Sequence, residues 1–153
     1  MKDLFRYIIK TEHSFGPLIL RIAYAIVMFP HGAQKLLGWW GGFGYTGTMK
    51  YFTTEGGLSP LTAFLVIFLE FFGTLLIFSG ILTRVISLAS IFLFIGMIIA
   101  VHLPFGFFMD WHSIQGGEGY EYHILAIGIL LSLLVSGAGK FSVDKLLNSK
   151  CNR

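Results

Sequence analysis

Four apolar runs, each about 20 residues long, constrain the fold more than any other feature of the sequence. They cover residues 17–37, 60–81, 85–103 and 120–137 in approximate bounds. A helix of about 20 apolar residues is long enough to cross the hydrocarbon core of a bilayer. The composition agrees, since 55% of the residues are hydrophobic and only 12% are charged, about half the charged fraction of a soluble domain. We therefore predict an all-α integral membrane protein built as a four-transmembrane-helix bundle.

The rest of the sequence predicts two short segments outside the bundle. Residues 1–16 are expected to form a cytoplasmic or interfacial segment, with a short amphipathic helix on the membrane surface. Residues 17–146 form the membrane domain, and residues 147–153 form a cytoplasmic tail. The single cysteine, Cys151, excludes an internal disulfide and a cysteine-ligated iron–sulfur cluster, and it is expected to be a solvated thiol.

Lysine and arginine are distributed unevenly between the two ends of the predicted bundle. The end that holds both termini carries Lys2, Arg6, Lys10, Arg84, Lys140, Lys145, Lys150 and Arg153, whereas the other carries Lys35 and Lys50. The positive-inside rule places the basic end, with both termini, in the cytoplasm. The net charge of +3 is modest, so the pattern indicates orientation in a lipid bilayer and no binding of nucleic acid.

Ionisable side chains inside the apolar runs are the best indicators of function, because each costs about 2.5–3.5 kcal/mol at the centre of a spanning helix. Glu70 lies ten residues after Pro60, which places it about 15 Å deep. The other polar residues lie near the outer ends of their runs. We predict that the outer half of the bundle gathers them in one polar cavity, formed by His31, Gln34, Lys35, Glu70, His102, Tyr120 and Glu121.

The helical wheel makes further predictions about packing. Gly128 and Ser132 share the face of Glu121, so this face is expected to pack closely against another helix. His123 lies about 200° away from Glu121 around the helix, which places it outside the cavity. Pro30 is expected to kink the first helix, because its ring removes a backbone donor.

The charged residues also have a structural interpretation. In this interpretation Glu70 pairs with Lys35 or His31 and has no role beyond neutralising charge between helices, as buried charges in membranes often do. Arg21 lies about 15 Å below His31, so it suits an interfacial cation as well as a cofactor contact. His31, His102, Glu70 and Glu121 are side chains of metal-binding type, but they have no short ligand spacing and Lys35 repels cations. No metal site is predicted.

A quinone suits this set of side chains better than a metal ion does. Quinone chemistry moves two protons with two electrons and needs acids or bases beside an apolar cleft. We take His31, Glu70, His102 and Glu121 as the candidate catalytic residues. The candidate cofactor-binding residues are Arg21, Gln34, Lys35 and Tyr120. A small polar ligand or a lipid in the same cavity remains an alternative.

The order and spacing of these motifs resemble the DoxX family over residues 18–146. The matching stretches are Arg21, His31-Gly32-Ala33-Gln34-Lys35-Leu36, Gly38-Trp39-Trp40-Gly41-Gly42, Glu70 with Gly73, Gly80-Ile81-Leu82-Thr83-Arg84, His102-Leu103-Pro104, Gly106-Phe107-Phe108 and Gly119-Tyr120-Glu121-Tyr122. The resemblance implies a multi-pass protein of the bacterial inner (cytoplasmic) membrane that acts as an oxidoreductase subunit. Some relatives look like the membrane subunit DoxD of thiosulfate:quinone oxidoreductase.

Three functions therefore remain open. The first is a quinone-linked redox subunit, which needs a soluble redox partner or a second subunit because the chain has no redox-active cysteine pair. The second is a non-enzymatic membrane scaffold or partner protein. The third is a small-ligand transporter, which four helices could form only as a homo-oligomer.

Overall fold

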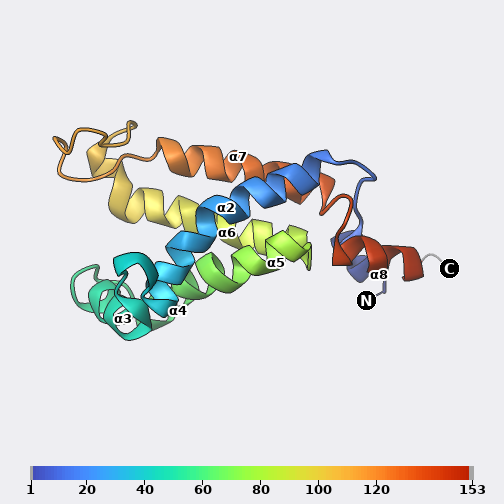
Figure 1. Ribbon diagram of the computed structural model, residues 1–153, viewed down its shortest axis with the longest axis horizontal. Coiled ribbons are helices and arrows are strands. Elements are labelled where there is room, and N and C mark those ends of the chain that lie inside the picture. The colour runs from blue at the N-terminus through green and yellow to red at the C-terminus, as the bar shows by residue number, and fades with distance from the viewer. Residues whose placement is uncertain (1, 152–153) are drawn as a thin grey trace.

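The structure is a computed structural model that describes residues 2–151 of the backbone and residues 4–150 of the side chains, so that the Cys151 thiol lies outside it. Across these residues all regular structure is helical and no strand occurs. Long helices run roughly along one axis, with short helices at either end (Figure 1). This confirms the all-α class.

Three helical segments are long and apolar enough to cross a membrane, and they coincide with the first three predicted runs. The first is α2 (Gly16–Leu37). The second consists of α4 (Pro60–Phe68), the π-helical turn η2 (Leu69–Gly73) and α5 (Thr74–Ser79). The third consists of α6 (Thr83–Met97), the π-helical turn η3 (Ile98–His102) and the 3₁₀ turn η4 (Leu103–Phe105). The fourth predicted run forms α7 (Glu121–Ser136), which is apolar but only 16 residues long.

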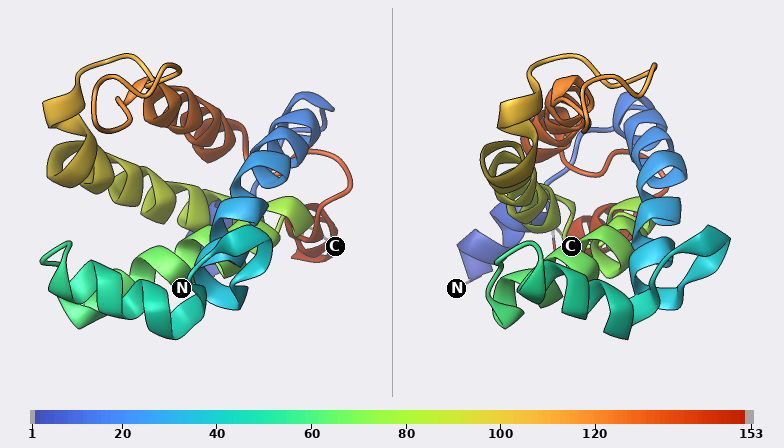
Figure 2. Two further views of the ribbon diagram at one scale, coloured as in Figure 1. Left: turned by 60° about the vertical axis from the view of Figure 1, so that its left-hand side comes forward. Right: turned by 90° about the vertical axis from the view of Figure 1, so that its left-hand side faces the viewer.

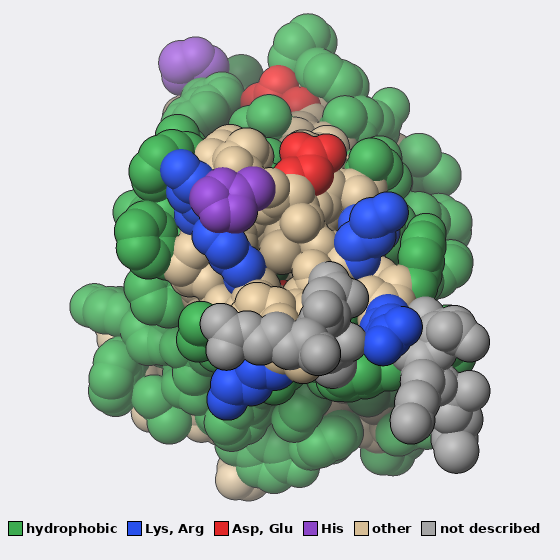
Figure 3. All heavy atoms as spheres, turned by 90° about the vertical axis from the view of Figure 1, so that its right-hand side faces the viewer, with side chains coloured by type: hydrophobic (Ala, Val, Ile, Leu, Met, Phe, Trp, Pro, Cys, Tyr) green, Lys and Arg blue, Asp and Glu red, His purple; other side chains and the backbone are tan. Residues whose placement is uncertain are grey.

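Shorter helices cover the two ends of these four segments. The helices α1 (Lys2–Ile9) and α8 (Val143–Cys151) lie with both termini at one end (Figure 1), and this end displays many of the lysine and arginine side chains (Figure 3). At the other end lie the 3₁₀ turn η1 (Trp39–Gly41), α3 (Gly44–Thr54) and the loop 106–120 (Figure 2). The sequence did not predict α3 or α8 as helices.

Local sequence explains where the long helices begin and end. Proline occupies the first turn of both α2 and α4, where its missing N–H has no helical partner to lose. Ser59 caps α4 by accepting a hydrogen bond from the Thr62 amide at 3.1 Å. Gly38 and Gly80 end α2 and α5 in the left-handed conformation that glycine adopts without strain. Within α2 the helix continues through Pro30 without a break.

The core lies between α2, α5, α6 and α7. Its buried side chains include Tyr24, Ile77, Phe94 and Leu130, one from each helix. Figure 2 shows the four helices placed around this common interior. Burying such side chains from all four helices fixes which face of each helix points inward.

The inward face of α7 differs from the predicted one. The helix buries His123, Ala126, Leu130 and Leu133, whereas Gly128 and Ser132 are exposed. The prediction that the Glu121 face packs closely within the chain is therefore wrong. The physical reason is that α7 is apolar on every side, so its sequence does not specify which side meets the core.

Arg21 fastens α2 to two other parts of the chain. Its side chain is 2% exposed, and its guanidinium donates to the carbonyl oxygens of Ile77 and Phe78 at the end of α5. It also donates to three carbonyls in the segment between α7 and α8, those of Ala138, Lys140 and Phe141. These carbonyls lie where helices end, and that of Ile77 also accepts from the Gly80 amide at 3.0 Å. One cation therefore joins the end of α5 to the segment between α7 and α8.

A buried carboxylate completes this end of the structure. Asp144, 2% exposed, accepts hydrogen bonds from the backbone amides of Leu82 and Thr83 at 2.9 Å each. It therefore caps the N-terminus of α6, where amides are otherwise without partners. The Asp144 amide in turn donates to Gly80 at 2.9 Å. Arg21 and Asp144 together hold the turn between α5 and α6 against α8.

We expect Arg21→Lys to destabilise the protein although it keeps the charge. A lysine ammonium has three donors on a single nitrogen, so at least two of the five bonds are lost. Each bond to a charged group is worth about 1.5–3 kcal/mol, which predicts a loss of about 3 kcal/mol or more in the free energy of unfolding. Unfolding in mixed detergent micelles measures it. Arg84→Lys, at a more exposed arginine, is the control, and equal losses in both variants would contradict the assignment.

Candidate functional site

A pocket of about 240 Å³ lies toward the end opposite the termini, between α2, η2, α6, η3 and α7. It combines ionisable residues with apolar ones. Its lining residues are Met28, His31, Lys35, Glu70, Phe94, Met97, His102, Met109, Glu118, Tyr122 and His123. The mixture of proton-exchanging groups and apolar walls is typical of a small-molecule site.

An ion pair between Lys35 and Glu70 forms one wall of the pocket. The Lys35 ammonium lies 2.6 Å from Oε2 of Glu70, and the side chains are 22% and 2% exposed. The other carboxylate oxygen, Oε1, is buried and has no hydrogen-bond partner among the residues that the structure describes. A buried carboxylate oxygen without a partner is costly, so Oε1 is an unused hydrogen-bond acceptor on a residue that lines the pocket.

The position of Glu70 depends on a close approach of two backbones. A Cβ atom on Gly32 would lie 2.5 Å from the Glu70 carbonyl oxygen, so only glycine lets α2 cross the second segment here. Lys35 follows Gly32 by one helical turn, which brings its ammonium over the carboxylate. Glu70 itself lies in the π-helical turn η2, and such turns are frequent at functional sites.

Histidines form the opposite wall. The rings of His102 and His123 lie 4.1 Å apart between centroids. Nδ1 of His102 lies 2.8 Å from the carbonyl oxygen of Glu118, and because a carbonyl only accepts, Nδ1 is the donor in this bond. His123 is 5% exposed, and its Nδ1 finds no hydrogen-bond partner within residues 4–150. The pocket thus has a second buried polar atom that is unsatisfied.

Four of the predicted site residues, His31, Lys35, Glu70 and His102, line this pocket. Gln34 instead lines an adjoining pocket of about 300 Å³ beside α3, and Lys35 belongs to both pockets. The amide of Gln34 donates to the Trp40 carbonyl at 3.4 Å. The roles predicted for these residues remain predictions, and the structure supplies their arrangement.

The other three predicted residues lie outside the pocket. Glu121 accepts a hydrogen bond from the Met109 amide at 3.1 Å, and the Tyr120 ring packs edge-on against Phe107 with centroids 5.7 Å apart. Both therefore hold the loop that covers this end. Arg21 lies at the opposite end with its donors on backbone carbonyls. The structure does not bring these three residues to Glu70.

Sequence reasoning left out Tyr122, His123 and Glu118, which do line the pocket. The signal for His123 was present, because a histidine in an apolar run is costly unless it faces other helices. The error came from choosing the face of α7 from Gly128 and Ser132. Tyr122 donates from its hydroxyl to the Met28 sulfur at 2.8 Å, and its ring lies 6.2 Å from that of His31.

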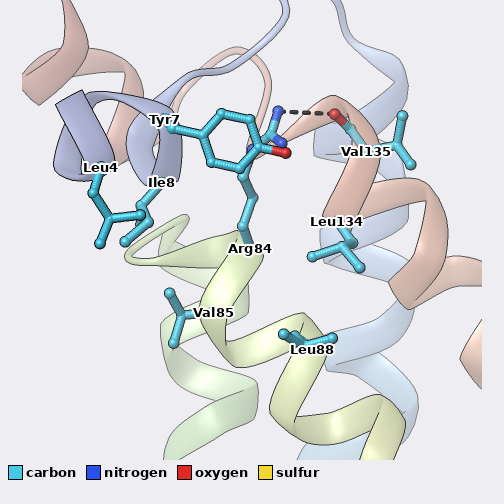
Figure 4. A pocket seen from close by; sticks show the side chains of 8 residues that line it. All are labelled: Leu4, Tyr7, Ile8, Arg84, Val85, Leu88, Leu134 and Val135. Atoms are coloured by element: carbon cyan, nitrogen blue, oxygen red, sulfur yellow. Dashed lines mark hydrogen bonds between the residues drawn. The ribbon is translucent and has the colours of Figure 1, made fainter.

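A larger pocket, of about 530 Å³, lies at the basic end between α1, α6 and α7 (Figure 4). Among the described residues that line it, Arg84 is the only charged one, and its guanidinium donates to the carbonyls of Lys10 and Val135 at 3.1 and 2.8 Å. Tyr7 lies against this guanidinium, and the remaining lining is aliphatic. Since no carboxylate or histidine occurs among its lining residues within 4–150, this pocket is a weaker candidate for proton chemistry. In the described part of the chain no group of three or more His, Cys, Asp or Glu residues is arranged to hold a metal ion.

We expect Lys35→Met to destabilise the protein more than the double variant Lys35→Met/Glu70→Gln. The single variant leaves a buried carboxylate without its cation, which costs about 3–5 kcal/mol. The double variant removes both charges and recovers most of that loss. A double-mutant cycle on the free energy of unfolding measures the coupling, with Lys50→Met as an exposed control. A double variant as unstable as the single one would show that the ion pair does not determine the loss.

Comparison with known proteins agrees with this architecture. The DoxX family profile matches residues 16–103. "Putative oxidoreductase CatD" of Bacillus subtilis (strain 168) is 30% identical over 120 residues, which are 78% of this chain and 79% of the relative. "Inner membrane protein YqjF" of Escherichia coli (strain K12) is 31% identical over 147 residues, 92% of this chain and 98% of the relative. No solved structure matches the chain. The chain is therefore a membrane protein that belongs to the DoxX family.

Proposed function

We propose that this protein is the membrane subunit of a quinone-linked oxidoreductase, and that it binds the quinone headgroup in the pocket between Lys35–Glu70 and the two histidines. The observation that carries the proposal is a pair of buried, unsatisfied polar atoms on two residues that line that one pocket. Within the described residues, Glu70 Oε1 and His123 Nδ1 both lack partners, and both residues line it. The name of the relative CatD supports the oxidoreductase class.

The residues present fit a quinone headgroup. The volume of about 240 Å³ lies just below the range of drug-sized pockets, which starts near 300 Å³, so it suits a single ring. Met28, Phe94 and Met97 supply an apolar and polarisable lining for that ring. Lys35, His123 and His102 offer hydrogen-bonding groups for its oxygens. A metal ion fits less well, because Lys35 would repel it.

A bound quinone supplies a couple of two electrons and two protons. Glu70 Oε1 is the atom at which this chain takes up or releases a proton, and Lys35 holds the carboxylate through its other oxygen. His123 positions the ligand through Nδ1, and the neighbouring ring of His102, tilted by 43° to that of His123, fixes the orientation of the His123 ring. The apolar residues and the loop held by Glu121 limit access of water.

The electrons must come from outside the chain. The sequence has a single cysteine, so it cannot form a dithiol couple. We propose that a second subunit or a soluble redox protein exchanges two electrons with the quinone. Such a partner would approach the same end of the molecule, where η1, α3 and the loop 106–120 present exposed aromatic residues including Trp40, Phe43 and Trp111.

We further propose that α2, the second and third segments and α7 all span the bacterial inner membrane, with the basic end in the cytoplasm. Both termini and the turn at 80–82 lie at one end (Figure 1), as four spans require. The 16 residues of α7 extend about 24 Å, which is short for a bilayer core of about 30 Å. Residues 137–139 and the loop before Glu121 would supply the remaining depth.

The quinone proposal predicts that Glu70→Gln weakens binding of the reduced, quinol form of a short-chain ubiquinone or menaquinone analogue, whose hydroxyl donates a hydrogen bond to Oε1 of the Glu70 carboxylate. The substitution keeps the size of the side chain but removes its charge and its capacity to take up a proton. Because a hydrogen bond to a charged group is worth about 1.5–3 kcal/mol, the dissociation constant should rise about tenfold or more. Quenching of tryptophan fluorescence in nanodiscs measures it, with organic extraction of the purified protein as a second readout.

Glu55→Gln, at the exposed end of α3, is the matched control and should bind as the wild type does. Glu121→Gln tests where the quinone analogue binds. If Glu121→Gln loses binding and Glu70→Gln keeps it, the ligand lies under the 106–120 loop and the pocket assignment is wrong. If no quinone binds or copurifies, the scaffold and transporter alternatives gain weight.

Topology has its own test. A membrane-impermeant maleimide should leave Cys151 unlabelled in intact spheroplasts and label it in inverted vesicles. Ser113→Cys, placed in the loop 106–120 of a Cys151→Ser background, should show the reverse pattern. Labelling of both positions from the same side would exclude an odd number of spans between them, and so would contradict a spanning α7.

A further inference from the structure

Three buried hydroxyls follow one side of α6 through the core. Thr83, Ser87 and Ser90 are each no more than 1% exposed, and their oxygens have no hydrogen-bond partner anywhere in residues 4–150. Positions 83, 87 and 90 share a helix face. Together with Glu70 Oε1 and His123 Nδ1, they are all the unsatisfied buried side-chain polar atoms of the described residues.

Hydroxyls elsewhere in the helices behave differently. Thr74, Ser79 and Ser136 each donate to the carbonyl four residues earlier, at 2.6–2.9 Å. Ser87 and Ser90 have the same option within α6, yet neither makes such a bond in the described structure. Since buried hydroxyls without partners are costly, native proteins usually satisfy them with ordered water.

Both ends of this row reach ionisable groups. At the basic end, the Thr83 amide donates to Oδ2 of Asp144 at 2.9 Å, which places the first hydroxyl beside that buried carboxylate. At the other end, Tyr24 is close enough to interact with Ser90 and, electrostatically, with Glu70 and Tyr122. Glu70 and Tyr122 line the pocket, so the row runs from Asp144 toward it.

The spacing of the hydroxyls suits single water molecules. Side chains three or four residues apart on a helix lie about 5–6 Å apart at Cβ. A water molecule that bonds two hydroxyls at about 2.8 Å each spans the same distance. One water in each gap would satisfy all three hydroxyls and join them in a continuous chain of hydrogen bonds, along which a proton can pass by successive transfers.

We propose that Thr83, Ser87, Ser90 and Tyr24 hold a file of water molecules that conducts protons between the Asp144 end and Glu70. A proton enters from solvent near Asp144, each water passes one on, and the Glu70 carboxylate receives it, so no bond other than O–H forms or breaks. The proposal deepens the function proposed above, because it names the side from which the pocket exchanges protons. Its tests do not require a quinone.

Radiolytic footprinting in water enriched in ¹⁸O tests the file directly, because radicals formed from internal water label the residues beside it. We expect Tyr24, although 3% exposed, to incorporate ¹⁸O in the full-length protein in nanodiscs. Leu130, equally buried in the core, should remain unlabelled. Ser87→Val and Ser90→Val should reduce the Tyr24 label to near background, whereas Ser90→Thr, which keeps the hydroxyl, and Ser132→Val, on the exposed face of α7, should leave it unchanged.

Proton flux tests conduction. In liposomes with a potassium gradient and valinomycin, Lys35→Met should leak protons faster than the wild type, because it removes the cation that repels protons at the pocket end of the file and keeps the Glu70 carboxylate that receives them. Adding Ser87→Val to this background should abolish the extra flux, and adding Ser132→Val should not. An unlabelled Tyr24, or flux indifferent to Ser87→Val, would overturn the proposal. Loss of quinone binding with the label intact would overturn only the proposed function.

Discussion

The guanidinium of Arg21 is the interaction on which the arrangement of the bundle depends. An arginine inside an apolar bundle is costly unless every donor is used, and here five carbonyl oxygens take its hydrogen bonds. Those carbonyls belong to the end of α5 and to the segment between α7 and α8, so the direction of each chain segment after its helix follows from one side chain. The Asp144 cap on α6 then completes the same end.

The molecule divides its polar groups between two ends. At the basic end, the buried charges bond to backbone groups and leave little capacity for a ligand. At the other end, Glu70 and His123 have unsatisfied atoms and line a pocket that combines ionisable residues with apolar ones. This contrast, more than burial alone, separates structural charges from candidate functional ones, because both Arg21 and Glu70 are 2% exposed.

The sequence was sufficient for the helical class and for the location of the three long segments, since length and apolar composition determine both. It was also sufficient to select His31, Lys35, Glu70 and His102 as polar residues in an apolar setting. It could not specify the inward face of α7, where leucine and isoleucine occur on every side, and His123 was missed for that reason. The sequence likewise did not indicate the π-helical turns at Glu70 and His102. An extra residue in a helical turn rotates the inward face of the residues that follow, without any change in composition.

The contact between Gly32 and Glu70 has a mechanical consequence for the pocket. It acts as a fulcrum for α2, with the clamped Arg21 about 16 Å away on one side and Lys35 about 4.5 Å away on the other. A tilt of α2 that moved Lys35 by a given amount would move Arg21 nearly four times as far and break its bonds to the carbonyls. Because the bonds of Arg21 resist this tilt of α2, a side chain far from the pocket limits how far Lys35 can move when a ligand binds.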